Sequence, residues 1–275
     1  MRNRILAGLG VAALATVGIA APATALSSTT ADLWVVHAFP GATVDIVITG
    51  AADVTLEDVA PQDVADLLDV PAGDYQVEIL LASDSSSLLG PVPVTLAANT
   101  SYSAVAHPNA DGDLTLTPFV NDVSSIAAGD SRVVVRHTAE APAVDVLAGA
   151  TELFTGVTSG QEGIDEVPAG TYPIAVEVSP DGPTAIGPVD LTFDAGTAYF
   201  VHAFGAGLDL PYGVVMFEIA GLGVGPDGVP AGSAGLAAET AGGNGGLVAG
   251  LGALLLGLIA AGTVIVRRAS ASATR

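Results

Sequence analysis

The sequence predicts an all-β protein whose exported body consists of two tandem immunoglobulin-like β-sandwich domains. Two observations lead to this fold class. One is an internal duplication with a spacing of about 100 residues, and the other is a series of short alternating segments separated by turn signals. Apolar segments near the two ends of the chain add an N-terminal signal peptide and one C-terminal transmembrane helix.

The duplication rests on three pairs of similar blocks that follow one another in the same order. Such an order makes chance similarity a poor explanation. The pairs are VVHAFPGATVDIV from Val35 with VRHTAEAPAVDVL from Val135, VPAGDYQVEI from Val70 with VPAGTYPIAVEV from Val167, and GPVPVTLAANTSYSAVAH from Gly90 with GPVDLTFDAGTAYFVHAF from Gly187. They divide the body into repeat 1, residues 30–120, and repeat 2, residues 130–220.

Each repeat contains the period-two alternation of half-buried strands, for example in Tyr75-Gln-Val-Glu-Ile79. Turn signals such as Pro40-Gly41 separate these segments, and we expect six or seven strands in each repeat. Pro91 and Pro93 predict an edge strand. The stretch LEDVAPQDVADLL, residues 56–68, is the exception, and we predict an acidic loop or a short helix there.

Tyrosine recurs at two equivalent positions, Tyr75 with Tyr172 and Tyr102 with Tyr199. The first pair stands two residues after a turn glycine, which resembles the tyrosine corner of immunoglobulin-like sandwiches. The chain has no cysteine, so it lacks the disulfide of antibody domains. "Immunoglobulin-like" therefore describes an architecture here.

The ends of the chain predict export and anchoring. Residues 1–25 combine two arginines, an apolar run and an Ala-x-Ala site, which are the parts of a signal peptide. Residues 247–266 are uncharged and long enough to cross a bilayer as one helix. Residues 267–275 form a basic tail, which favours the cytoplasmic side, and the Gly/Pro/Ala-rich residues 221–246 predict a flexible linker.

A second interpretation of the C-terminal end is cell-wall attachment. Residues 236–242 read LAAETAG, similar to a sortase recognition motif, although Ala241 stands where the motif has Gly. An apolar stretch and a basic tail follow, as in a sorting signal. We therefore keep sortase-like processing near Thr240 as the alternative to a permanent membrane anchor.

The charge of the exported body excludes nucleic acid as a partner. The seven basic residues are all arginine, and five of them lie at the termini. Only Arg132 and Arg136 remain between the end segments, against 29 acidic residues, so the formal charge there is 2 − 29 = −27. Binding to nucleic acid or to anionic lipid headgroups needs the opposite sign.

The repeated opening block, the VPAGxY turn and LAANTSYSAVA together resemble the bacterial family named domain of unknown function 4397. The resemblance covers nearly the whole body. It implies exported proteins with tandem β-rich modules, and the signal at the C-terminus points to a high-GC Gram-positive bacterium. Repeat 2 departs from the pattern at Glu140, where repeat 1 has Pro40. The resemblance implies no reaction.

The repeated His and Asp are the candidate site residues: His37 with Asp45, and His137 with Asp145. Catalysis by a Ser-His-Asp arrangement would need a nucleophile, and no G-x-S-x-G motif occurs. A zinc site would need three or four clustered ligands. We therefore predict no catalytic residue, and expect these side chains to brace strands and turns, with ligand binding as the alternative.

Calcium is the only cofactor that the sequence suggests. Asp111-Gly112-Asp113 forms a turn that could present two carboxylates, but no EF-hand pattern accompanies it.

Three function classes follow. The favoured one is a non-catalytic surface protein for binding, adhesion or envelope structure, whose partner is a cell-wall polymer or a surface protein. The second is an accessory solute- or carbohydrate-binding protein, and the third is an unrecognised hydrolase.

Overall fold

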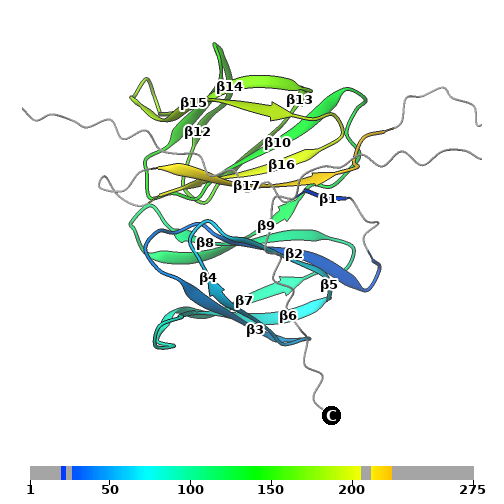
Figure 1. Ribbon diagram of the computed structural model, residues 1–275, viewed down its shortest axis with the longest axis vertical. Helices are drawn as coiled ribbons and strands as arrows, with labels where there is room; N and C mark the ends of the chain where they lie inside the picture. The colour runs from blue at the N-terminus through cyan, green and yellow to red at the C-terminus, as the bar shows by residue number, and fades with distance from the viewer. Residues whose placement is uncertain (1–19, 23–26, 206–211, 225–275) are drawn as a thin grey trace, which may run out of the picture. The chain divides into compact units, whose positions relative to one another are not determined.

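The computed structural model of the protein describes residues 20–22, 27–205 and 212–224. All regular secondary structure in these residues is strand, and the strands form four sheets that lie as layers in Figure 1. The prediction of an all-β sandwich protein is thereby confirmed. Of the predicted signal peptide only Ala20–Pro22 is described; it forms strand β1, which pairs in parallel with β17.

The predicted transmembrane helix, the basic tail and Thr240 lie outside the described residues. Within the described ranges, the chain forms no helix of the length and apolarity that a bilayer crossing requires.

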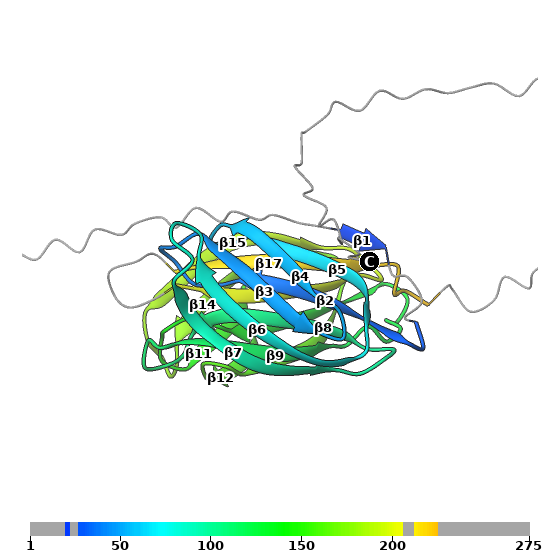
Figure 2. The same cartoon turned by 90° about the horizontal axis from the view of Figure 1, so that it is seen from below.

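Repeat 1 forms one pair of facing sheets, with the orders β5-β2-β8-β9 and β4-β3-β6-β7. Figure 2 views the molecule from the side of the second of these sheets, with β3 and β6 in front. The strands are β2 (Thr30–His37), β3 (Val44–Gly50), β4 (Val54–Val59), β5 (Val64–Pro71), β6 (Gly73–Leu81), β7 (Ser87–Leu96), β8 (Ser101–Pro108) and β9 (Leu114–Asn121).

Repeat 2 forms a second pair of sheets with the equivalent orders β13-β10-β16-β17 and β12-β11-β14-β15. Its strands are β10 (Asp130–His137), β11 (Val144–Ala148), β12 (Thr151–Val157), β13 (Glu162–Pro168), β14 (Gly170–Val178), β15 (Thr184–Phe193), β16 (Ala198–Phe204) and β17 (Gly213–Ala220). Each repeat thus has eight strands, more than the sequence predicted.

The strand order differs from that of immunoglobulin domains. There the first strand lies beside the second, in a sheet ABED that faces CFG. Here the first strand of each repeat lies between the fourth and the seventh, and it runs parallel to the seventh, as β2 with β8 and β10 with β16. The two-layer architecture agrees with the sequence prediction, and the pairing of the strands does not follow the immunoglobulin pattern.

The prediction of a loop or short helix over residues 56–68 is wrong. This stretch contains most of β4 and the first part of β5. Pro61 stands in the turn between them, where Asp63 donates its backbone N–H to the carbonyl of Ala60 at 3.0 Å. Val59 is buried in the core and Leu67 packs against it. Burial of these alternating apolar side chains outweighs the acidic composition, because the carboxylates point to solvent.

Two local predictions are confirmed. Strand β7, which carries Pro91 and Pro93, is an edge strand. The hydroxyl of Tyr75 donates to the carbonyl of Pro71 at 2.6 Å, and that of Tyr172 donates to Pro168 at 2.7 Å, as a tyrosine corner requires.

The second tyrosine pair also has matching bonds. The hydroxyl of Tyr102 accepts the N–H of Ala97, and that of Tyr199 accepts the N–H of Asp194. In each repeat, therefore, tyrosine hydroxyls at two equivalent positions make hydrogen bonds to nearby backbone groups.

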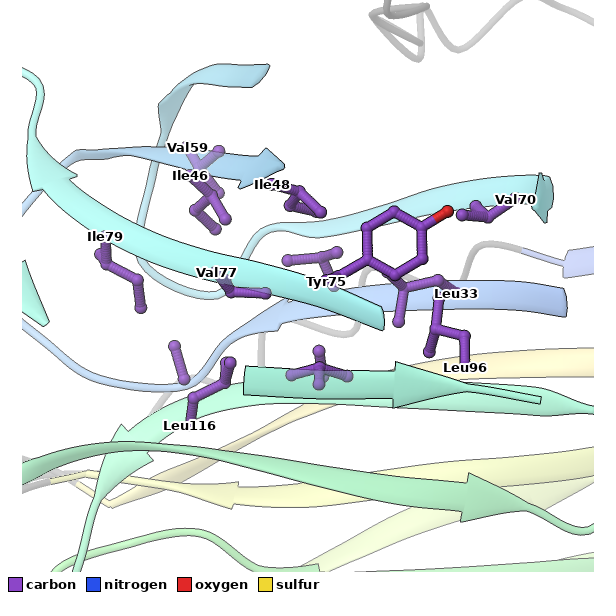
Figure 3. Close-up of a cluster of buried hydrophobic side chains, with 14 of the residues drawn as sticks. Leu33, Ile46, Ile48, Val59, Val70, Tyr75, Val77, Ile79, Leu96 and Leu116 are labelled. Carbon is purple, nitrogen blue, oxygen red and sulfur yellow. The ribbon is translucent and has the colours of Figure 1, made fainter. Parts of the chain in front are cut away.

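Three apolar clusters hold the sheets together. Core one lies between the two sheets of repeat 1, and Figure 3 shows its Tyr75 ring among Leu33, Ile48 and Val70. Core two lies inside repeat 2 and includes Val146. The third cluster contains residues of both repeats and forms the joint between them.

Candidate functional site: the joint between the repeats

The candidate carboxylates Asp45 and Asp145 each hold an irregular point of the neighbouring strand. Asp45 accepts the backbone N–H of Asp58 at 2.9 Å, and Asp145 accepts that of Gly156 at 2.7 Å. Asp58 and Gly156 have positive φ angles of 53° and 63°, and the pairing register shifts beside both. The repeated aspartate thus supplies an acceptor where each β-bulge interrupts the ladder.

The candidate histidines lie at the ends of β2 and β10 and are buried. His137 donates from Nε2 to the carbonyl of Pro142 at 2.8 Å, while its Nδ1 faces the N–H of Ala139 at 3.4 Å. This histidine therefore holds the turn after β10 in the neutral form. Burial lowers its pKa, against the opposing effect of the Pro142 carbonyl.

His37 packs its ring against Phe39, with the ring centroids 4.1 Å apart. Neither ring nitrogen makes a hydrogen bond of ordinary geometry. Burial lowers the pKa of His37, and the nearby backbone of Ala60 and Val59 opposes this effect. The structure gives no hydrogen bond between His37 and Asp45, or between His137 and Asp145, in the part of the chain that it describes; each aspartate bonds the next strand instead.

Asp111 and Asp113 lie in a turn that Asn109 organises. The side-chain oxygen of Asn109 accepts the backbone N–H groups of both aspartates at 2.9 Å. In residues 27–205 and 212–224, no group of three or more His, Cys, Asp or Glu side chains is arranged to hold a metal ion. Calcium binding at this turn stays a prediction.

The joint is the apolar cluster between the sheets β5-β2-β8-β9 and β13-β10-β16-β17. Trp34 of repeat 1 stacks on Phe217 of repeat 2, with centroids 4.3 Å apart and planes 10° apart. Side chains from the connecting segment and from the residues after β17 complete it. Its buried apolar residues are Trp34, Val36, Ala38, Val105, Phe119, Ile126, Val134, Ala198, Phe200, Val215, Phe217, Ile219 and Leu222.

Arg136 crosses this joint with no exposed surface. It donates to Ser103 Oγ and Asn121 Oδ1 of repeat 1, each at 2.9 Å. Within repeat 2 it pairs with Glu162 at 2.9 Å and lies 3.3 Å from His202 Nε2. A guanidinium suits this position because its planar set of donors can satisfy several acceptors at once.

Two aromatic rings cover the same guanidinium. Its central carbon lies 4.5 Å from the ring centroid of Phe119 in repeat 1, and 5.2 Å from that of Phe200 in repeat 2. The charge is thus enclosed by hydrogen bonds and by the π faces of two rings, which offsets the cost of its desolvation.

Arg132 fastens the segment that connects the repeats. It donates to the carbonyls of Asp122 and Ser124 at 3.0 Å and pairs with Glu166 at 2.6 Å. Arg132 is 4 % exposed. Both arginines of the body are therefore used in the joint, a role that the charge count alone did not predict. The available signal was their position: Arg136 stands where repeat 1 has Val36, on the face opposite core two.

Two further histidines face the joint, His107 from β8 and His202 from β16. His107 contacts the carbonyl of Pro108 through Nδ1 and the hydroxyl of Thr117 through Nε2, each at 2.8 Å. Burial lowers its pKa. Burial, followed by the charge of Arg136, places the pKa of His202 well below its ordinary value. The joint therefore contains neutral imidazoles beside a buried cation.

Cavities inside the sandwiches are small. The cavity in core one has a volume of about 10 Å³, and that in core two about 30 Å³. The second has room for about one water molecule, and its walls are apolar apart from His137.

Comparison with known proteins gives one family and no curated relative. No curated protein matches the sequence. Two solved structures, proposed cell adhesion proteins from Parabacteroides distasonis and Bacteroides eggerthii, are each 9 % identical to the chain at a TM-score of 0.17. The first alignment covers 70 % of this chain and 98 % of the other, and the second covers 74 % and 100 %. A TM-score of this size carries no argument about fold or function.

The family comparison agrees with the resemblance read from the repeated motifs. The model of that family matches the chain from repeat 1 through the opening block of repeat 2, which contains His37, Asp45, His137 and Asp145. Residues 31–147 of the chain match the model of the family described as "Domain of unknown function (DUF4397)".

Proposed function

We propose that the protein is a non-catalytic component of the cell envelope, in which the two sandwiches act together as one binding or structural unit. The observation that carries this proposal is the structural use of the repeated aspartates, of His137 and of the two arginines. Asp45 and Asp145 hold bulges, His137 holds a turn, and Arg132 and Arg136 join the repeats. These groups stabilise the fold instead of facing an open cleft.

The charge distribution supports a location outside the cell. Because the arginines of the body are buried, the ionised side chains exposed on the described residues are acidic. A surface of one sign keeps neighbouring molecules apart and soluble. Such a surface suits a protein displayed at high density, and a cell-wall polymer or a surface protein is the partner that we propose.

Export and anchoring belong to the same proposal. In cells that make the protein, protease added outside should degrade residues 27–224 and spare a tag after Arg275. A chain that ends at residue 246 should be released into the medium. The anchor proposal fails if this truncated chain stays with the cells. If Thr240→Ala alone releases the protein from the wall fraction, the sortase alternative is right.

The binding role is tested with the detergent-solubilised full chain. It should retain purified cell-wall polysaccharide or a surface protein, and retention should not depend on any turnover. His37→Ala and His137→Ala are expected to lower stability, since both side chains are buried. A hydrolytic activity that is present in the parent and lost in these variants, when both remain folded, would contradict the non-catalytic proposal.

A further inference from the structure

The environment of His202 depends on its being neutral. Nε2 of His202 lies 3.3 Å from a terminal nitrogen of Arg136, and guanidinium nitrogens only donate. His202 Nε2 must therefore be the acceptor, which places the ring proton on Nδ1. Nδ1 itself has no partner in the structure.

Protonation of His202 would convert this acceptor into a donor facing a donor. It would also place two positive charges in contact inside the joint. Arg136 has no means of adapting, because the nitrogen that faces His202, Nη1, also donates to Ser103, while Nε and Nη2 are held by Glu162 and Asn121. His107 differs, since its partner Thr117 has a hydroxyl that can turn from donor to acceptor.

The groups around His202 offer no compensating negative charge. The titratable groups that act on it are Arg136 from β10 and His107 from β8, both of which disfavour a second cation, and only the backbone of Val215 and Phe200 opposes their effect and that of burial. Phe217 of β17 covers the ring, with the centroids 5.8 Å apart. Glu162 of β13 bonds the opposite edge of the guanidinium, at Nε.

We propose that the joint is an acid-sensitive lock: protonation of His202 releases Arg136 from repeat 1, and the two sandwiches separate while each stays folded. Each sandwich has its own core, so separation exposes the joint cluster without opening core one or core two. The exposed surface would be apolar and aromatic, centred on Trp34 and Phe217.

The sign of the pH effect follows from linkage. The pKa of His202 is lower in the closed form than in the open form, where it returns to about 6.5. The closed form is therefore fully stable above pH 6.5 and loses stability as the pH falls. The equilibrium constant for opening rises by up to about tenfold per pH unit for each histidine that is protonated only in the open form.

The chain offers two internal probes for this opening. Trp34 is its sole tryptophan and stacks across the joint, so its emission should shift to longer wavelength when water reaches it. The chain also lacks cysteine, which allows two spin labels at chosen sites. Thr95→Cys and Thr192→Cys place them on equivalent exposed positions of β7 and β15, on the outer sheets.

The experiment is an acid titration of the full chain in detergent, following the label distance, Trp34 emission and far-ultraviolet circular dichroism together. We expect the distance distribution to broaden, and the emission to shift, at a higher pH than the loss of strand signal. His202→Gln keeps an oxygen acceptor for Arg136 and cannot be protonated, so it should move opening down by at least one pH unit.

Two further variants complete the experiment, one as a second substitution of His202 and one as a control. His202→Val inserts the residue that stands at the equivalent position of repeat 1, Val105, and serves if the glutamine variant does not fold. His37→Gln removes a buried histidine of repeat 1 that contacts Phe39 of core one, so it should leave the opening pH unchanged. The proposal is overturned if opening coincides with unfolding in the parent, or if the parent, His202→Gln and His202→Val open at the same pH.

Discussion

At the residue scale, the duplicated Asp has a measurable role in the fold. Asp145 is 9 % exposed and accepts a 2.7 Å bond from the N–H of Gly156. Replacement by alanine leaves that N–H without its acceptor at a partly buried bulge. Asp145→Ala should therefore lower the free energy of unfolding by about 1–2 kcal/mol, measured by urea denaturation.

The matched control is Asp145→Asn, whose carbonyl oxygen can still accept the same bond. It should lose less than half as much stability as the alanine variant. Equal losses in the two variants would show that the carboxylate charge, and not the acceptor, is what the bulge requires.

Arg136 is the residue on which the joint depends most. Arg136→Val introduces the residue of repeat 1 but leaves Glu162, Ser103 and Asn121 without their donor. Removal of one partner of a buried ion pair lowers the free energy of unfolding by about 3–5 kcal/mol. Because Glu162 is partly exposed, we expect a loss of about 3 kcal/mol for Arg136→Val. Urea denaturation followed by Trp34 emission measures this loss at the joint.

Glu162→Gln is the control for this prediction, because the amide oxygen can still accept from Arg136. Its loss should be smaller than that of Arg136→Val. A loss below about 0.5 kcal/mol for Arg136→Val would mean that the apolar cluster alone holds the joint.

At the element scale, the two repeats use the same strands with different core packing. Ile46 on β3 and Val146 on β11 occupy equivalent positions and line the cavities of about 10 Å³ and about 30 Å³. Val146→Ile adds one methylene where there is space. It should stabilise repeat 2 by about 0.8 kcal/mol, measured by thermal or urea unfolding.

The reciprocal change is the control. Ile46→Val enlarges the smaller cavity and should cost about 0.5–1.5 kcal/mol. If Val146→Ile destabilises instead, the cavity of core two does not have the shape that an added methylene needs.

The strand pairing also explains why a few signals were misleading. Residues 56–68 contain four acidic side chains and a proline, which favour a loop in isolation. In the fold, Pro61 occupies the turn between β4 and β5, and the alternate apolar residues reach core one. Acidic side chains are tolerated on edge strands, where they also oppose pairing with another molecule.

At the scale of the whole molecule, the dominant feature is a charge of one sign. Residues 30–220 carry 27 of the chain's 29 acidic residues, and the two arginines among them are buried. Mutual repulsion of these carboxylates opposes the compact state, and salt screens it. The free energy of unfolding should therefore rise between about 10 mM and 500 mM sodium chloride, because the Debye length falls from about 30 Å to a few ångströms.

The same titration tests the calcium prediction at Asp111 and Asp113. Calcium chloride at matched ionic strength should stabilise the protein no more than sodium chloride does if the effect is screening alone. An additional gain that disappears in Asp111→Asn would indicate a specific site. A decrease of stability with sodium chloride would contradict the repulsion argument.

The sequence by itself determined the duplication, the sandwich architecture, the resemblance to the family and the tyrosine corners at Tyr75 and Tyr172. These depend on interactions close along the chain, such as the four-residue reach from Tyr75 to Pro71, or on alternation within one strand. It also showed that Arg132 and Arg136 are the lone cations of the body.

Only the tertiary structure decided what those cations do. The joint brings Arg136 together with Ser103, Asn121 and His202, which are separated from it by 33, 15 and 66 positions. No local sequence pattern predicts these contacts. Both faces of β2 and β10 are buried, so their apolar alternation does not distinguish the face in core one or core two from the face in the joint. The strand order and the neutral state of His202 follow from that packing.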